Sequence, residues 1–418
     1  MLHVPRLLAT LYLVAAGLAA AATTGYHRFH EGNSLTDPLT ARNIGLHSLA
    51  TNCGFARDSV GQVIIAGTPI DWAWENRQSQ FVGVLTNGGY ELLVLQPFRI
   101  TQLDWFEREA IAAASVYRFA LQYSPNATLV VYYTWASVTS NANPDQTFVN
   151  QMQGVTNYLE FFTDVMQQEF PTKKVFVVPS GIALMKMAAD IAAGQGPEGV
   201  PSITNWFDPM GTTGASSIHP NENGFWLSCL VHFDSYYSEY YASHPEKVGN
   251  LPTNIPFTIY WRGSNDASWT RWPSVTSNQS AYCQRIAWLA VTNYPRTFLS
   301  GIPRVKGDTN APSAPGAPYG AILSSNTFSL AWGASTDNVA VARYTIMTNH
   351  EYAVNVNVTS TNATIILTNV TSQSVEVTVR AWDTSYNFAD STFIIPEPVV
   401  AGALIVPLLL RAASRASK

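Results

Sequence analysis

The chain has 418 residues, which is enough for one domain of a few hundred residues and a smaller second domain. Its 47% hydrophobic residues exclude general disorder, and the charged fraction of 12% is about half the usual ~25%. A formal net charge of -5 offers no basic surface for a phosphate backbone, so no nucleic-acid partner is expected. The three cysteines, Cys53, Cys229 and Cys283, match no zinc-ligand spacing and indicate neither a disulfide framework nor a metal site.

Residues 1–22 have the pattern of a secretory signal peptide. Arg6 lies in a short basic start, residues 7–18 are apolar, and four alanines at 19–22 satisfy the small-residue rule for cleavage. We therefore expect the mature chain to be exported.

Residues 23–303 alternate short apolar runs with longer periodic segments. The expected strands and helices are strands at 26–29, 63–66, 91–95, 128–133 and 175–178, and helices at 104–123 and 147–169. This order predicts a three-layer α/β domain with a parallel sheet and helices on both faces. Polar or Gly/Pro residues follow each strand, as expected where strands end beneath active-site loops.

A serine follows the first expected strand in the run HEGNSLTD at 30–37. On a tight turn between strand and helix, the Ser34 hydroxyl is held at the carboxyl edge of the sheet, where it needs a base within hydrogen-bond reach. Gly32 permits the turn, and the backbone amide of Ser34 can donate to a developing oxyanion. By itself this run also suits a helix N-cap.

A histidine stands before an apolar helix in the run IHPNENG at 218–224. His219 has a side-chain pKa in the range of a general base, and Pro220 fixes the loop that carries it. We expect the remaining histidines considered to be structural or on the surface: His27, His30, His47, His232 and His244.

Together the two runs resemble the SGNH/GDSL hydrolase family over about residues 25–300. The resemblance implies a flavodoxin-like fold, Ser34 as nucleophile, His219 as base and no cofactor. The family usually has Asp three residues before the histidine, where this chain has Ser216. Asp208 or Glu222 can supply the missing charge; alternatively, a Ser-His dyad works with Ser216 or a backbone carbonyl orienting the ring.

The same resemblance implies an oxyanion hole. The family often has a Gly-x-Asn-Asp block after the third strand, where this chain has Gln96, and divergent branches with Gly-Asn-Ser show glutamine there. The amide of Gln96 can donate as asparagine does. Gly67, after the second strand, fits the oxyanion glycine better than Gly54. The expected hole is therefore formed by Ser34, Gly67 and Gln96.

Several large aromatic residues lie on or near loops that follow strands. Each alone is better explained as part of the core, but together they favour a carbohydrate ester as substrate. They are Trp72, Trp74, Phe98, Trp105 and Trp206.

A linker and a second domain follow. Residues 304–318 are rich in Pro, Gly and small residues. Alternating runs at 327–332, 342–348, 352–358, 364–367 and 374–381 predict a small β-sandwich. The segments SLAWGASTDNVAVARYTI and VEVTVRAWDTSYNFADS resemble a fibronectin type III domain, an immunoglobulin-like sandwich over residues 311–395, with Trp332 in its core and Tyr344 on a neighbouring strand. The resemblance implies a spacer.

Residues 396–418 combine Pro-Glu-Pro, a dozen mostly apolar residues and a basic tail. The apolar stretch is shorter than the roughly 20 residues of a spanning helix. The segment resembles the PEP-CTERM sorting signal of bacterial surface proteins. That resemblance implies an exosortase-like processing enzyme as partner, and a transient or permanent membrane association at the cell surface.

Three function classes follow from these patterns. The first is an exported serine esterase or deacetylase that acts on acylated polysaccharide or glycoside. The second is a surface protein whose degenerate hydrolase domain binds glycan without turnover, and Ser216 in the acid position favours it. The third is a structural component of an extracellular matrix, favoured by the sorting tail and the spacer.

Overall fold

The computed structural model describes residues 25–36, 45–55, 59–100, 102–208, 216–243, 257–259, 269–271, 274–300, 306–324, 327–366 and 374–395. The expected signal peptide at 1–22 and sorting signal at 396–418 lie outside these ranges. Within them, no helix combines the length and the hydrophobicity needed to cross a membrane.

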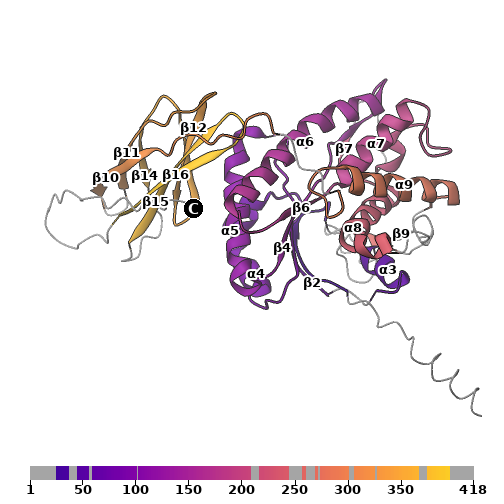
Figure 1. The fold of residues 1–418 in the computed structure, drawn as a ribbon. Coiled ribbons are helices and arrows are strands. Elements are labelled where there is room, and N and C mark those ends of the chain that lie inside the picture. The colour runs from indigo at the N-terminus through magenta and orange to yellow at the C-terminus, as the bar shows by residue number, and fades with distance from the viewer. Residues whose placement is uncertain are drawn as a thin grey trace, which may run out of the picture.

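A five-stranded parallel sheet lies at the centre of the first domain, in the order β2-β1-β3-β4-β6 (Figure 1). Its strands are β1 His27–Gly32, β2 Ser59–Ile64, β3 Leu92–Leu95, β4 Thr128–Tyr132 and β6 Val175–Val178. The predicted parallel sheet is confirmed. β2 begins at Ser59, before the expected residue 63, because this edge strand starts with half-exposed polar residues that an apolar run does not reveal.

Helices cover both faces of the sheet. Figure 1 shows α4 and α5 on one side and α3, α8 and α9 on the other, while α6 follows α5 and packs against α7. Their bounds are α3 Gly45–Asn52, α4 Ile70–Leu85, α5 Phe106–Tyr123, α6 Pro144–Glu169, α7 Ser180–Ala192, α8 Glu222–Ser243 and α9 Ser277–Asn293. The short elements are η1 Leu103–Trp105, η2 Ile203–Trp206, the pair β5 Val138–Thr139 with β7 Ser216–Ser217, and the pair β8 Phe257–Ile259 with β9 Trp269–Arg271.

The described residues between 316 and 395 form a C-terminal β-domain of two antiparallel sheets, in the orders β10-β11-β14 and β13-β12-β15-β16. Its strands are β10 Gly316–Ser324, β11 Thr327–Gly333, β12 Val341–Thr348, β13 Glu351–Asn357, β14 Asn362–Ile366, β15 Val375–Asp383 and β16 Phe388–Ile395. Buried residues from both sheets share one core, in which the Trp332 and Tyr344 rings meet edge to face at 5.4 Å. The fibronectin type III assignment stays a prediction.

β10 begins inside the segment expected to be a linker. Pro318 lies in this strand, where its missing N–H is accommodated by a shift in register between Gly316 and Tyr319. The connection between the two domains therefore ends where β10 begins, at Gly316. It is shorter than the linker expected at 304–318.

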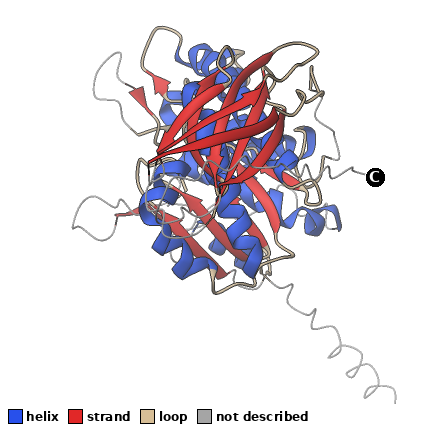
Figure 2. Ribbon diagram, turned by 90° about the vertical axis from the view of Figure 1, so that its left-hand side faces the viewer, coloured by secondary structure: helices blue, strands red, loops and turns tan. Residues whose placement is uncertain are grey.

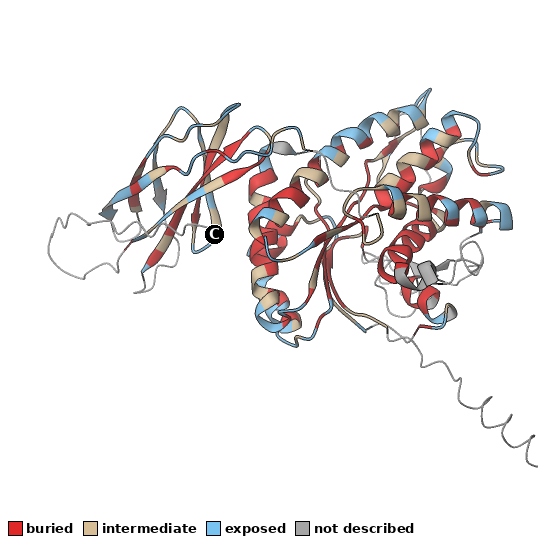
Figure 3. Ribbon diagram, viewed as in Figure 1, coloured by how far each residue is buried: buried red, intermediate tan, exposed pale blue. Residues whose placement is uncertain are grey.

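The C-terminal β-domain packs against α5 and α6 of the α/β domain. Trp382, Tyr386 and Phe388 belong to the same buried cluster as the core of the α/β domain. Figure 2, which turns the β-domain toward the viewer, shows its strands crossing in front of the helices. α5 is buried over most of its length (Figure 3), which explains its alanine-rich sequence: it is covered by the sheet on one side and by the β-domain on the other.

Candidate active site

Ser34 lies on a tight turn directly after β1, between the turns that follow β2 and β3. The turn is closed by the backbone N–H of Thr36, which donates to the carbonyl of Asn33 at 2.9 Å. A Cβ on Gly32 would lie 2.2 Å from Thr36 Oγ1 and 2.8 Å from Gln96 Oε1, so only glycine fits there. The turn leaves the Ser34 side chain partly exposed at the carboxyl edge of the sheet.

His219 reaches this serine from a distant part of the sequence. Its Nε2 lies 2.9 Å from Ser34 Oγ. The backbone on either side is held by an antiparallel bridge between Phe207 and Pro220, and Trp135 Nε1 donates to the carbonyl of Ile218 at 2.8 Å. The structure thus brings the two predicted residues to hydrogen-bond distance.

Asp208 lies opposite His219 in the same bridge. Its backbone N–H donates to the His219 carbonyl at 2.9 Å, and residues that face each other in an antiparallel pair project to the same side. Burial lowers the pKa of His219, and the negative charge of Asp208 opposes this without cancelling it. The ring is therefore neutral near pH 7 and its Nε2 can accept the Ser34 proton.

Ser216 occupies a different position from the one that a triad acid requires. It is exposed on β7, where it pairs with Thr139 of β5. Its neighbour Ser217 contacts the backbone of His219: the hydroxyl accepts from the N–H and donates to the carbonyl, both at 3.3 Å. Glu222 begins α8. Of the expected candidates, Asp208 is the one whose charge acts on the His219 ring.

Gln96 follows β3 and holds the turn that carries Ser34. Its Oε1 accepts from the Asn33 backbone N–H at 3.2 Å and from Thr36 Oγ1 at 2.5 Å, and its Nε2 donates to Asn33 Oδ1 at 3.0 Å. Asn33 Oδ1 also accepts the backbone N–H of Leu35 at 3.0 Å. The amide expected to face an oxyanion is thus committed, at least in part, to positioning the turn.

Gly67 lies in the turn after β2, with a φ of +68° that favours glycine. Asn33 Nδ2 donates to the carbonyl of Thr68, the residue after Gly67, at 3.4 Å. This hydrogen bond joins the turn after β2 to the turn that carries Ser34. Within the described part of the chain, the backbone N–H groups of Ser34 and Gly67 donate to no other group. Both are therefore available as oxyanion donors.

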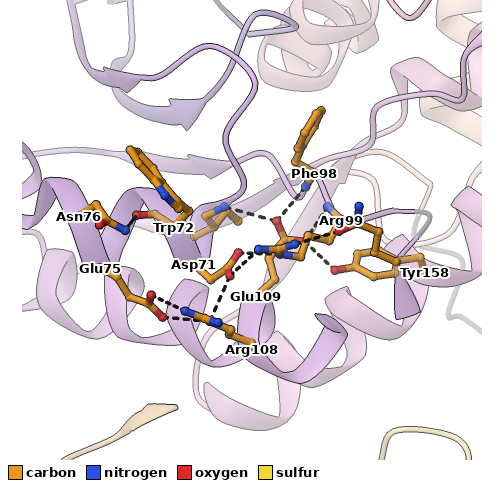
Figure 4. Close-up of polar contacts among 11 residues, drawn as sticks. Asp71, Trp72, Glu75, Asn76, Phe98, Arg99, Arg108, Glu109 and Tyr158 are labelled. Carbon is orange, nitrogen blue, oxygen red and sulfur yellow. Dashed lines mark hydrogen bonds and ion pairs between the residues drawn. The ribbon is translucent and has the colours of Figure 1, made fainter. Parts of the chain in front are cut away.

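Sequence reasoning missed two buried carboxylates that fix the loops after β2 and β3. Asp71 accepts both Nε and Nη2 of Arg99 at 2.9 Å, and Arg108 lies 3.3 Å from it (Figure 4). Glu109 accepts the backbone N–H groups of Phe98 and Arg99 at 2.9 and 3.1 Å.

Burial raises the pKa of Glu109, although its hydrogen bonds oppose the shift. Tyr158 also donates its hydroxyl to Glu109 at 2.6 Å. The signal in the sequence was the pair of acidic residues at the starts of two helices, which is also typical of a simple favourable interaction with the helix dipole.

The five aromatic residues that favour a carbohydrate substrate differ in their exposure. Trp74 and Trp206 are 5% and 1% exposed and belong to the core. Trp72 and Trp105 are 37% and 42% exposed, and the Arg99 guanidinium lies 4.4 Å from the Trp105 ring centroid. Figure 4 shows Trp72 and Phe98 beside the same buried ion pairs. Trp72 lies in the first turn of α4, which follows β2, and Trp105 ends η1, which follows β3.

The sequence also makes predictions about the other histidines, the cysteines and metal binding. His30, His47 and His232 are buried, His27 Nδ1 meets the Gly89 carbonyl at 3.1 Å, and His244 lies outside the described residues. Cys53, Cys229 and Cys283 form no disulfide with one another. Among the described residues, the grouping of side chains able to hold a metal ion lies in the C-terminal β-domain rather than beside Ser34.

Comparisons with known proteins find no matching family model and no matching curated protein. Among solved structures, a DUF4886 family protein from Bacteroides uniformis is 14% identical at a TM-score of 0.40, covering 65% of this chain and 95% of that chain. A protein from Slackia heliotrinireducens described as a candidate SGNH hydrolase is 16% identical at 0.32, covering 50% and 98%. Phospholipase A1 from Streptomyces albidoflavus is 13% identical at 0.32, covering 48% and 94%. At these TM-scores none of the likenesses fixes the function of this chain.

Proposed function

We propose that this chain is a serine hydrolase that cleaves ester bonds, with Ser34 as nucleophile, His219 as general base and Asp208 as the acid that stabilises the ring. The observation that carries the proposal is the distance of 2.9 Å between Ser34 Oγ and His219 Nε2 at the carboxyl edge of a parallel sheet. A strand-to-helix turn that holds a serine against a neutral imidazole is the arrangement that activates a hydroxyl.

The reaction follows from these positions. His219 Nε2 takes the Ser34 proton as Oγ attacks the ester carbonyl, and the backbone N–H groups of Ser34 and Gly67 donate to the oxyanion. Asp208 stabilises the positive ring that forms. His219 then returns the proton to the leaving alcohol, and water activated by the same ring hydrolyses the acyl-enzyme and frees Ser34.

The substrate in this proposal is an acylated carbohydrate. Trp72 at the start of α4 and Trp105 at the end of η1 are exposed, and aromatic rings stack on the apolar faces of sugars. The proposal also includes export through residues 1–22, spacing by a fibronectin type III-like domain, and processing of residues 396–418 at the surface by an exosortase-like enzyme.

A second candidate is a glycan-binding surface protein without turnover. It is favoured by Ser216, which stands where related hydrolases have their aspartate. Asp208 opposite His219 weakens this alternative, because the carboxylate that the ring needs comes from another segment.

The test is hydrolysis of p-nitrophenyl acetate and of an acetylated oligosaccharide by the full chain. Ser34→Ala should lose ~10⁴-fold or more in kcat/KM, as expected when the nucleophile is removed. The matched control is Ser216→Ala, the same change at an exposed site, which should keep the wild-type rate. A folded wild-type chain that binds the oligosaccharide but hydrolyses neither ester would replace the first candidate by the second.

A further inference from the structure

Three aspartates from separate segments meet in the C-terminal β-domain. Asp308 comes from the segment that leads into the domain, Asp337 from the loop between β11 and β12, and Asp383 from the end of β15. One carboxylate oxygen of each lies within 4.8 Å of the other two. Three negative groups converge only when another interaction offsets their repulsion.

Two of the three carboxylates have an oxygen that is not used elsewhere, whereas both oxygens of Asp383 already accept hydrogen bonds from Ser385 and Asn387. Asp308 Oδ2 and Asp337 Oδ1 are buried and accept no hydrogen bond within the described part of the chain. Asp383 is 1% exposed, and burial raises the pKa of its carboxyl. A buried carboxylate oxygen that lacks a partner is costly, so these atoms point to a ligand that supplies positive charge.

The other oxygens of the same side chains fix their orientation. Asp337 Oδ2 accepts the backbone N–H groups of Val339 and Ala340 at 2.8 and 2.9 Å. Asp383 Oδ1 accepts those of Ser385 and Asn387, both at 2.8 Å. These two carboxylates are therefore held in place before any ligand binds, which lowers the cost of ordering on binding.

A lysine close to the cluster is directed elsewhere. Lys306 donates to Asn387 Oδ1 at 2.6 Å and lies 3.8 Å from Asp164 of α6. Its charge lowers the pKa of Asp383 less than burial raises it. Among the described residues, no lysine, arginine or histidine forms an ion pair with the three aspartates.

The geometry points to one calcium ion bound by Asp308, Asp337 and Asp383. All three ligands are hard oxygens, which suit Ca²⁺ and Mg²⁺ rather than softer metals. Three oxygens that all lie within 4.8 Å of one another can contact one calcium ion with ligands at about 2.3–2.6 Å, whereas magnesium demands near-ideal octahedral geometry at about 2.0–2.1 Å. The expectation of no metal rested on cysteine spacing, which says nothing about such a site.

Calcium at this position connects the segment before β10, which carries Asp308, to the loop after β11 and to the end of β15. Asn387 Nδ2 already donates to the carbonyls of Asp308 and Asn310 at 3.1 Å, and Lys306 connects the same segment to α6. Binding should therefore stiffen the connection between the two domains and raise the melting temperature of the full chain.

The experiment is calorimetric titration of the full chain, freed of metal by EDTA, with CaCl₂ and separately with MgCl₂. We expect one calcium ion per chain with a Kd of roughly 10⁻⁵ to 10⁻³ M, weaker binding of magnesium, and a higher melting temperature in calcium than in EDTA. Asp337→Asn and Asp308→Asn should each weaken calcium binding at least ~10-fold, since each removes a charged ligand. Glu376→Gln, which removes one charge from an exposed pair with His350 in the same domain, is the matched control and should bind as wild type.

Three results would overturn the proposal. They are the absence of calcium binding and of any calcium effect on wild-type melting, calcium binding unchanged in both aspartate variants, and magnesium binding as tight as calcium. Both variants are used so that the failure of one to fold still leaves a test. Asp383 is left unchanged because its side chain accepts three hydrogen bonds that hold the end of β15.

Discussion

At the scale of single residues, the identity of the acid beside His219 decides how the site works. Asp208→Asn should lower kcat/KM by on the order of 10²–10⁴-fold, because the charged ring formed in the reaction loses its carboxylate. Ser216→Ala should change the rate little, since Ser216 is exposed on β7. Steady-state kinetics on one aryl ester checks both. A larger loss in Ser216→Ala than in Asp208→Asn would make Ser216 the orienting residue.

The pH dependence gives a second prediction for the same pair. In the proposed mechanism His219 must be neutral, so kcat/KM should fall as pH drops through the His219 pKa, which burial places below 6.5 against the opposing charge of Asp208. Asp208→Asn removes the negative charge that raises the His219 pKa. The acidic limb of the profile of kcat/KM against pH should therefore move to lower pH, even though the maximum rate falls. Profiles of kcat/KM between pH 4 and 8 measure the shift. A limb that moves to higher pH would show that Asp208 does not act on the ring.

The proximity of Ser34 and His219 could be predicted from the sequence because each sits in a short local pattern: a strand followed by a glycine turn, and a His-Pro before a helix. Asp208 could not be assigned in the same way, because its relation to His219 depends on a backbone bridge between Phe207 and Pro220. The three aspartates of the β-domain were missed for the same reason, since their convergence is set by the packing of separate segments.

At the scale of elements, the turn that carries Ser34 depends on its connection to β3. Gln96→Leu removes three hydrogen bonds to Asn33 and Thr36 and should lower kcat by about 10²-fold, the magnitude also expected for the loss of an oxyanion donor. Thr36→Val separates the two roles, because it loosens the turn and leaves the Gln96 amide in place. It should also lower kcat if Gln96 acts as support.

The matched control for Thr36→Val is Thr292→Val, which removes a hydroxyl that donates to the backbone within α9. Measurement of kcat and of thermal melting for each variant distinguishes a local effect on the site from a general loss of stability. Full activity of Thr36→Val, together with a loss in Gln96→Leu, would return Gln96 to the role of an oxyanion donor.

The elements themselves were predictable where one physical cause dominates. Buried parallel strands such as β3 and β4 read as continuous apolar runs, because helices cover both faces of the sheet. β16 lacks this signal, since it mixes apolar with polar residues and its Asp390 lies opposite Arg380 of β15 as a cross-strand ion pair. That β16 is a strand follows from its pairing with β15, and this pairing cannot be seen in the local sequence of β16.

At the scale of the whole molecule, the two domains share buried charge as well as buried apolar surface. Glu107 of α5 lies 3.0 Å from Arg343 of β12, and Trp74 Nε1 donates to Glu351 of β13 at 2.9 Å. Arg380 of β15, with its side chain 3% exposed, pairs with Glu169 at the end of α6 at 2.5 Å. A spacer that moved freely would leave these groups unpaired, so the C-terminal β-domain is a packed part of the molecule and we expect one cooperative unfolding transition.

Glu169→Gln tests this coupling. Burial by itself would raise the pKa of Glu169, but Arg380 and Arg118 outweigh it and hold the pKa below its usual range. A carboxyl whose pKa is lowered in the folded state contributes stability above its unfolded pKa of about 4.5, and that contribution is lost as pH falls through the folded value. Since Glu169→Gln leaves a buried arginine with one fewer carboxylate, it should cost about 2–4 kcal/mol at pH 7.

The deficit of Glu169→Gln in the free energy of unfolding should shrink as pH falls from about 4.5 through the lowered folded pKa, because below that pKa the wild-type carboxyl is protonated and loses the same ion pairs. Melting curves of both chains from pH 3 to 8 measure the difference, with Glu376→Gln as a control of equal charge change in an exposed pair. If the interface couples the domains, the variant should also separate the single transition into two at neutral pH. A deficit that stays constant with pH, or a single transition that merely moves to lower temperature, would show that Glu169 contributes by packing and that the apolar contacts of α5 alone hold the domains together.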